Sequence, residues 1–110
     1  MGASDFFDRA KRSNYKNIKE AFNSIVEEAR YEYGHGGYTG TIAEKSEFKN
    51  VPSRVVKNIS GEDPITWNNV EDIAEQILEN LPYSDKWGPC WVIEVEGENG
   101  GWLFFGSAPS

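Results

Sequence analysis

The sequence predicts an α+β fold: a mainly antiparallel sheet of about four strands with two helices on one face, in the order strand, helix, strand, helix, strand, strand. Two observations carry this prediction. Apolar residues recur at helical spacing over residues 16–33 and 68–81. An alternating pattern followed by a turn signal closes the chain over residues 90–106. With 110 residues the chain can bury one hydrophobic core, so we expect a single domain over residues 1–110.

The first helix is expected over residues 16–33. Asn17 with Glu20 three positions later forms a capping box, the pattern that marks a helix start. One apolar stripe follows it, at Ile18, Phe22, Ile25, Ala29 and Tyr33.

The second helix is expected over residues 68–81. Asn68 and Glu71 repeat the capping-box pattern, and Pro82 ends the helix. Its stripe is continuous, at Val70, Ile73, Ala74, Ile77, Leu78 and Leu81. The opposite face is acidic and is explained by contact with solvent.

The strands are less uniform. Residues 90–96 alternate in polarity and are expected to pair with residues 101–106 across an Asn99-Gly100 turn. Residues 1–14 are expected to add a strand against the sheet edge. Residues 39–51 are expected to be extended, as an exposed edge strand or as two short strands, and residues 52–65 to form a loop.

A glycine-rich loop joins the first helix to the segment that follows. It contains four of the eleven glycines, at positions 34, 36, 37 and 40. Glycine frees the backbone and lets another group approach it closely. One hypothesis is that Gly34 caps the helix and the rest is a flexible connector. The other is that the loop binds a phosphate-bearing or nucleotide-like ligand, because aromatic, hydroxyl and cationic side chains surround the glycines.

Under the second hypothesis, the candidate ligand-binding residues are Arg30, Tyr33, His35, Gly36, Gly37, Tyr38, Thr39, Thr41, Lys45 and Trp87. Two of them have an alternative role. Arg30 lies one turn before Gly34 and can bind the carbonyls at the helix end instead. Trp87 precedes a strand and can plug the end of the sheet instead of stacking on a ligand or partner.

Residues 37–45 read Gly-Tyr-Thr-Gly-Thr-Ile-Ala-Glu-Lys. This segment resembles a motif of a family of small, mostly uncharacterised phage and prophage proteins. In that family a Tyr-Glu-Tyr-Gly-His segment precedes the motif, as at 31–35, and Trp-Gly-Pro and Phe-Phe-Gly segments follow, as at 87–89 and 104–106. The resemblance implies a protein that counters host defence, by sequestering a signal nucleotide or by blocking a host enzyme.

The composition argues against most catalytic chemistry. The chain has one histidine, His35, and one cysteine, Cys90, which excludes an internal disulfide and Cys/His metal sites. A small thiol in a strand is usually part of the core, so a Cys90–His35 nucleophile pair is set aside. We expect no enzymatic activity, no catalytic residues, no metal and no cofactor.

The net charge of −7 is unevenly distributed. Residues 34–60 carry four basic and two acidic side chains, whereas residues 61–110 carry ten acidic and one basic. A chain this acidic is not expected to bind duplex nucleic acid. A small anionic ligand suits the basic segment and a basic partner suits the acidic half, unless the acidic residues only keep the protein soluble.

No apolar run approaches the ~20 residues of a membrane span, and the first eight residues lack the features of a signal peptide. We therefore expect no membrane contact and a cytoplasmic location, in the host cell if the protein is phage-encoded.

The expected function is a phage-type counter-defence protein that sequesters a small nucleotide-like signalling molecule through the loop at 34–45. The first alternative is an acidic inhibitor of a host nucleic-acid-binding defence enzyme, of the anti-CRISPR or anti-restriction type. The second is a small enzyme acting on such a nucleotide. We also expect a homo-oligomer, because a small domain can enlarge a ligand site by building it between protomers; the edge at 39–51 is the candidate contact.

Overall fold

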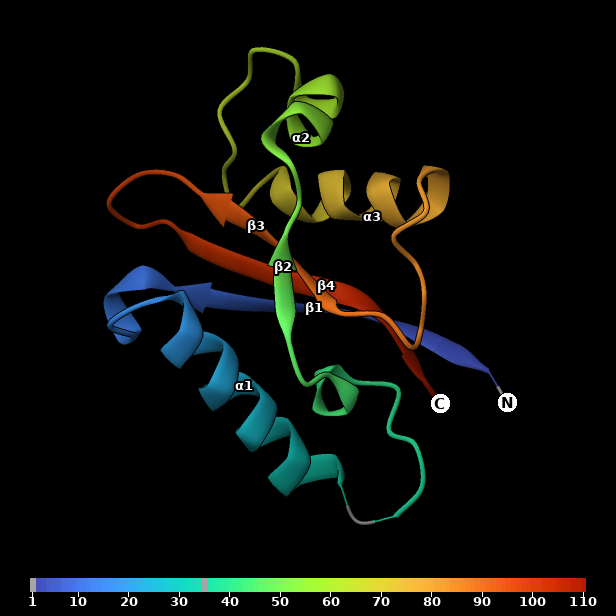
Figure 1. Cartoon of the computed structure of the whole chain (residues 1–110). Coiled ribbons are helices and arrows are strands. Elements are labelled where there is room, and N and C mark those ends of the chain that lie inside the picture. Colours follow the sequence, from blue (N-terminus) through green and yellow to red (C-terminus); the bar gives the residue numbers. More distant parts are fainter. Residues whose placement is uncertain (1, 35) are drawn as a thin grey trace.

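The computed structural model of the chain (Figure 1) describes residues 2–34 and 36–110. Two single turns of 3-10 helix, η1 (Arg12–Asn14) and η2 (Ile42–Glu44), interrupt the main elements. The main elements are, in chain order, β1 (Ala3–Lys11), α1 (Ile18–Tyr33), β2 (Phe48–Asn50), α2 (Ser53–Ser60), α3 (Val70–Asn80), β3 (Cys90–Val95) and β4 (Gly101–Pro109).

The four strands form one sheet in the order β1-β4-β3-β2. β4 is antiparallel to both β1 and β3, whereas β2 runs parallel to β3. The predicted α+β fold with a mainly antiparallel, four-stranded sheet is therefore confirmed. β1 lies at the sheet edge, as expected for residues 1–14, and pairs with β4 from Ala3↔Pro109 to Lys11↔Gly101.

Helices cover both faces of the sheet, so the prediction of two helices on one face was wrong. α1 lies below the sheet in Figure 1, and α2 and α3 lie above it. The reason is visible in β4, where Trp102 and Phe104 join the core cluster under α1 while Leu103 and Phe105 join the cluster under α3. All nine residues of this strand are buried, and a central strand with apolar side chains on both faces needs cover on both sides.

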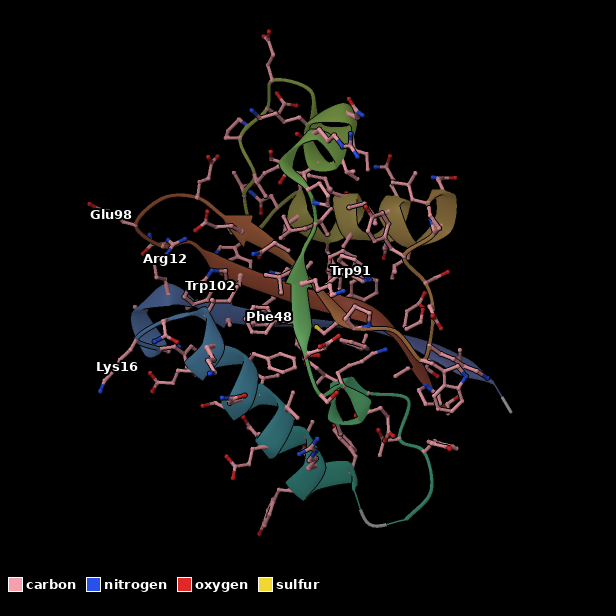
Figure 2. The ribbon with its side chains drawn as sticks, viewed as in Figure 1. Arg12, Lys16, Phe48, Trp91, Glu98 and Trp102 are labelled. Atoms are coloured by element: carbon pink, nitrogen blue, oxygen red, sulfur yellow. The ribbon has the colours of Figure 1, made fainter. Side chains whose placement is uncertain are left out.

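β3 shows the same division. Val92 is buried on the α1 side, and Ile93 and Val95 are buried on the α3 side. Trp91 and Phe48, both labelled in Figure 2, pack against different clusters, Trp91 on the α3 side and Phe48 on the α1 side.

Local signals set the ends of α1. Asn17 Oδ1 accepts a hydrogen bond from Glu20 N at 2.8 Å, and Glu20 Oε2 accepts one from Lys16 N at 3.1 Å. The first bond confirms Asn17 as the predicted cap, whereas Glu20 accepts from the residue before the cap and not from Asn17 N as in a complete capping box. Gly34 closes the helix by donating to Arg30 O at 2.9 Å. A Cβ at Gly34 would lie 2.5 Å from that oxygen, so a larger residue cannot end the helix in this way.

The second predicted capping box does not form. α3 begins at Val70, and Asn69 makes no side-chain cap bond. Asn69 instead stabilises the preceding turn, accepting from Thr66 N at 2.8 Å and donating to Pro64 O at 2.9 Å. An asparagine can bond backwards into a turn as readily as forwards into a helix.

Two segments between the predicted helices differ from expectation. The expected loop at 52–65 contains the eight-residue helix α2, whose Val55, Val56 and Ile59 pack against the cluster under α3. It ends at Gly61, where φ is +66°. The expected extended segment at 39–51 is a strand only at Phe48–Asn50 and forms the turn η2 at Ile42–Glu44.

The closing hairpin pairs as predicted, from Trp91↔Phe105 to Val95↔Gly101. Its connection is longer than a two-residue Asn99-Gly100 turn. Strand pairing stops at Val95, Gly97 takes a φ of +93°, and Gly100 N donates to Gly97 O at 3.1 Å. Within the described residues, no helix has both the length and the apolarity needed to cross a bilayer.

Asp8 gives a testable consequence of this layering. It lies on the α1 face of β1 between the buried residues Phe6 and Ala10, opposite Phe104. Burial raises the pKa of Asp8 above its usual value of 3.8. The folded state therefore binds more protons than the unfolded state between pH 3.8 and the folded pKa, and stability falls as pH rises through that window.

We therefore expect Asp8→Asn to be more stable than the wild type at neutral pH. The difference should disappear below pH 3.8, where the carboxyl group is protonated in both states. Urea denaturation at acidic and neutral pH measures it. A variant that is less stable at neutral pH would mean that the ionised carboxylate of Asp8 has a stabilising partner.

Candidate functional site

The glycine-rich loop follows α1 and runs beside the ends of β1 and β4. Gly40, with a φ of +69°, donates to Pro109 O at 2.8 Å, and a Cβ there would lie 3.1 Å from side-chain atoms of Ser4 and Ser110. Gly40 is thus required for close packing of the loop against the N-terminal end of β1 and the C-terminal end of β4.

The hydroxyl groups of this segment bond to the protein itself. Thr39 Oγ1 lies 2.9 Å from Glu44 Oε2 and 2.8 Å from Thr41 Oγ1. Thr41 Oγ1 caps η2 by accepting from Ala43 N at 3.2 Å. These bonds make Thr39 and Thr41 parts of a compact turn.

Lys45 has a different role from the one expected of a ligand-binding cation. Its side chain is buried, with 2% exposed, and Nζ donates to Gly88 O at 2.8 Å and to Lys86 O at 3.1 Å. Burial lowers the pKa of Lys45. The ammonium group therefore holds the two carbonyls that flank Trp87 and positions the loop that carries this residue.

Arg30 is exposed, and its Nε donates to Ala43 O at 3.3 Å. It therefore links the last turn of α1 to η2. Tyr33 is 53% exposed at the end of α1. His35 lies outside the described residues.

Two of the predicted aromatic residues meet on the surface. The rings of Tyr38 and Trp87 stand edge to face, with centroids 5.6 Å apart and an interplanar angle of 77°. Their exposed fractions are 48% and 59%. Lys86 Nζ lies 5.6 Å from the centroid of the Trp87 ring. We call Tyr38, Lys86 and Trp87 the aromatic surface. Tyr38 and Trp87 are among the candidate residues predicted from the sequence, whereas Lys86 is not.

The open backbone next to Tyr38 belongs to Gly36 and Gly37. A Cβ at either position would meet no atom within 4 Å. Gly37 has a φ of +62° and needs glycine for that reason, whereas Gly36 has no such constraint. Close approach to the main chain is therefore possible beside the aromatic surface.

A small cavity of about 170 Å³ adjoins Trp87. Its lining residues are Glu44, Ser46, Glu47, Lys86, Trp87, Gly88, Pro89 and Pro109. This volume admits one ring system, whereas complete small-molecule sites usually measure about 300–1,000 Å³. The exposed carboxylate of Glu47 is an acceptor for amino or imino groups of such a ring.

Cys90 does not form a second candidate site. Cys90 is fully buried, and burial raises the pKa of its thiol, which favours the unreactive protonated form. No group of three or more metal-ligating side chains occurs within residues 2–34 and 36–110.

Sequence reasoning missed a larger cleft on another part of the molecule, about 890 Å³ in volume, between β3 and α2. It arises because β2 has only three residues and the chain then turns away into α2. Only Pro52, two residues after the strand, hinted at this departure. Comparison of the chain with protein-family models, with curated proteins and with solved structures finds no match.

Proposed function

We propose that this chain is a binding protein that sequesters a small nucleotide-like molecule on its aromatic surface, and that it acts as a phage-type counter-defence factor. The observation that carries the proposal is the exposed Tyr38–Trp87 pair with Lys86 beside it. Flat aromatic rings are the groups on which bases stack, and here two exposed rings meet beside a cation.

The aromatic surface is held in place before any ligand arrives. Lys45 fixes the main chain on both sides of Trp87, and the Thr39–Glu44 network fixes the turn that follows Tyr38. Little ordering is then needed on binding, and the lost conformational freedom that opposes association is small.

The charges around the surface suggest an orientation for the ligand. The heterocycle stacks on Trp87 with its amino edge toward Glu47, where a phosphate group would be repelled. The phosphate group lies toward Lys86 and the open main chain at Gly36 and Gly37. A second protomer would add the wall that a cavity of about 170 Å³ lacks, which supports the proposal of a homo-oligomer.

Tryptophan fluorescence titration with linear and cyclic mono- and dinucleotides tests this function. Trp87 is the only tryptophan among the exposed large side chains of the described residues, so stacking should quench its emission. We expect Trp87→Ala and Tyr38→Ala to bind about five- to 150-fold more weakly, because base stacking is worth ~1–3 kcal/mol. Gly36→Val should also weaken binding, by blocking approach to the main chain.

Tyr31→Ala is the matched control, because Tyr31 is 86% exposed on α1 and, within the described residues, makes no ring contact with the aromatic surface. Its affinity should equal that of the wild type. Equal affinity of folded Trp87→Ala and wild type would contradict the proposal, and so would the absence of binding by every nucleotide of the panel.

A second candidate function rests on the outer face of α3. Asp72, Glu75 and Glu79 are exposed there, and no salt bridge to them is found in the described part of the chain. This face suits an inhibitor of a basic, nucleic-acid-binding enzyme. Glu75→Lys with Glu79→Lys should then abolish activity in a counter-defence assay, whereas Trp87→Ala should leave it unchanged. Nucleotide sequestration requires the opposite order.

A further inference from the structure

The cleft of about 890 Å³ lies between β3, α2 and the loop that follows α2. It is at the C-terminal end of β2, whereas η2 precedes the N-terminal end of that strand. Apolar side chains from both core clusters line it, among them Val56, Ile65, Ile93 and Trp102. It shares none of its lining residues with the cavity beside Trp87. It is therefore a separate site, independent of the proposed function.

The floor of this cleft contains an unpaired piece of sheet edge. Alternate residues of β3 direct their main-chain groups away from β4: Cys90 N donates to Glu47 O, and Val92 O accepts from Val51 N at 3.0 Å. Further along, Glu96 N donates to Ile65 O at 3.3 Å. Main-chain groups alternate in direction along a strand, so the N–H and C=O groups of Glu94 point the same way as those of Cys90, Val92 and Glu96.

Glu94 N–H and C=O therefore point into the cleft. The chain leaves β3 after Val51 and returns only at Ile65, so neither segment reaches Glu94. No hydrogen bond to these two groups is found within residues 2–34 and 36–110. One donor and one acceptor of the sheet are thus free for an extended chain to pair with.

The rim of the cleft is acidic. Glu62, Asp63, Glu94 and Glu96 line it, against one cation, Lys57. Arg12 Nη2 lies 3.2 Å from Glu94 Oε2 and neutralises that carboxylate. The described residues place no cation within salt-bridge distance of the other three.

We infer that this cleft binds a short, extended, basic peptide segment by strand addition to β3. The main chain of the peptide pairs with Glu94 N–H and C=O, its apolar side chains enter the cleft, and its Lys or Arg side chains meet Glu62, Asp63 and Glu96. The edge is free only at Glu94, because Val92 O and Glu96 N are already bonded to Val51 N and Ile65 O. The stretch from Val92 to Glu96 spans about 13 Å at ~3.3 Å per residue, which limits the peptide to four or five residues. The acidic rim favours this partner over an anionic ligand or an acidic peptide.

The probe is the pentapeptide acetyl-Val-Lys-Val-Lys-Val-amide, titrated into the whole protein and followed by amide hydrogen exchange. The Glu94 amide should exchange rapidly in the free protein and at least tenfold more slowly when the peptide saturates. The Ile93 and Val95 amides, which face β4, should not change. Acetyl-Val-Glu-Val-Glu-Val-amide should bind at least tenfold more weakly.

Backbone methylation tests the pairing directly. Two further peptides are compared. One carries main-chain N-methyl groups on its lysines and the other on its valines, so that each lacks the N–H donors along one of the two edges of the extended peptide. Pairing along a single edge predicts that one of them binds at least tenfold more weakly and the other binds like the parent. Equal affinity of both would overturn the inference.

The double variant Glu62→Gln with Asp63→Asn should weaken binding of the lysine peptide at least tenfold. Glu98→Gln is the matched control, because Glu98 is exposed at the tip of the hairpin and does not line the cleft (Figure 2). Equal binding of the lysine and glutamate peptides, or an unchanged exchange rate at Glu94, would overturn the inference. So would a protein whose Glu94 amide is already protected without peptide by association with a second copy.

Discussion

Gly101→Ala is expected to destabilise the protein by about 3 kcal/mol, the upper end of the usual cost of overpacking. A Cβ at Gly101 would lie 1.9 Å from Ala10 O and 2.9 Å from Arg12 N. Both atoms are main-chain atoms at the end of the β1–β4 ladder, where Lys11 pairs with Gly101. Neither can move aside without opening the longest strand pair of the sheet.

Urea denaturation of Gly101→Ala measures this cost. Gly36→Ala is the control, because a Cβ at Gly36 would have no atom within 4 Å. Its stability should differ from that of the wild type by less than ~0.5 kcal/mol. Similar midpoints for Gly101→Ala and the wild type would show that β1 can shift on β4, and that the paired ladder is not rigid.

Lys45→Met is expected to cost about 2 kcal/mol of stability and also to weaken ligand binding. Methionine has an unbranched side chain of similar length, but it lacks the ammonium group that donates to Lys86 O and Gly88 O. Leaving these carbonyl groups unsatisfied costs ~1–3 kcal/mol. The loop around Trp87 then loses its attachment to η2, so the aromatic surface is no longer held in place.

Lys49→Met is the matched control, because Lys49 is exposed on β2. It removes the same charge from the same part of the sequence, and both stability and nucleotide affinity should stay unchanged. Denaturation midpoints and fluorescence titrations of the two variants give the comparison. If Lys49→Met weakened nucleotide binding as much as Lys45→Met, net charge and not the position of Trp87 would govern binding.

The features that the sequence predicted well are those determined by neighbouring residues. Asn17 and Gly34 mark the two ends of α1. The alternation over residues 90–96 predicted the first strand of the hairpin. α2 was missed because its apolar positions are few and lie between Pro52 and Gly61, both of which favour loops. The cover on both sheet faces was missed because alternating polarity over residues 90–96 is typical of a strand with one face in solvent, whereas Val92, on the same face as Glu94, is buried.

The sequence named the residues of the candidate site, but it did not indicate the contacts that they make. Thr39 and Thr41 bond within a few positions, so their part in a local turn was accessible from their spacing. The bonds of Lys45 cross 41 and 43 positions of the chain to Lys86 and Gly88. No local pattern encodes such a contact, and the lysine was therefore interpreted as a free cation for a ligand.

The central claim is that the aromatic surface retains a nucleotide-like molecule. The most direct measurement incubates purified wild type, Tyr31→Ala and Trp87→Ala with a bacterial small-molecule extract, removes unbound material, releases what remains by heat and identifies it by mass spectrometry. A phosphorylated heterocyclic compound should be released from the wild type and from Tyr31→Ala but not from Trp87→Ala. Release of the same compound from folded Trp87→Ala, or release of no such compound from any of the three, would contradict it.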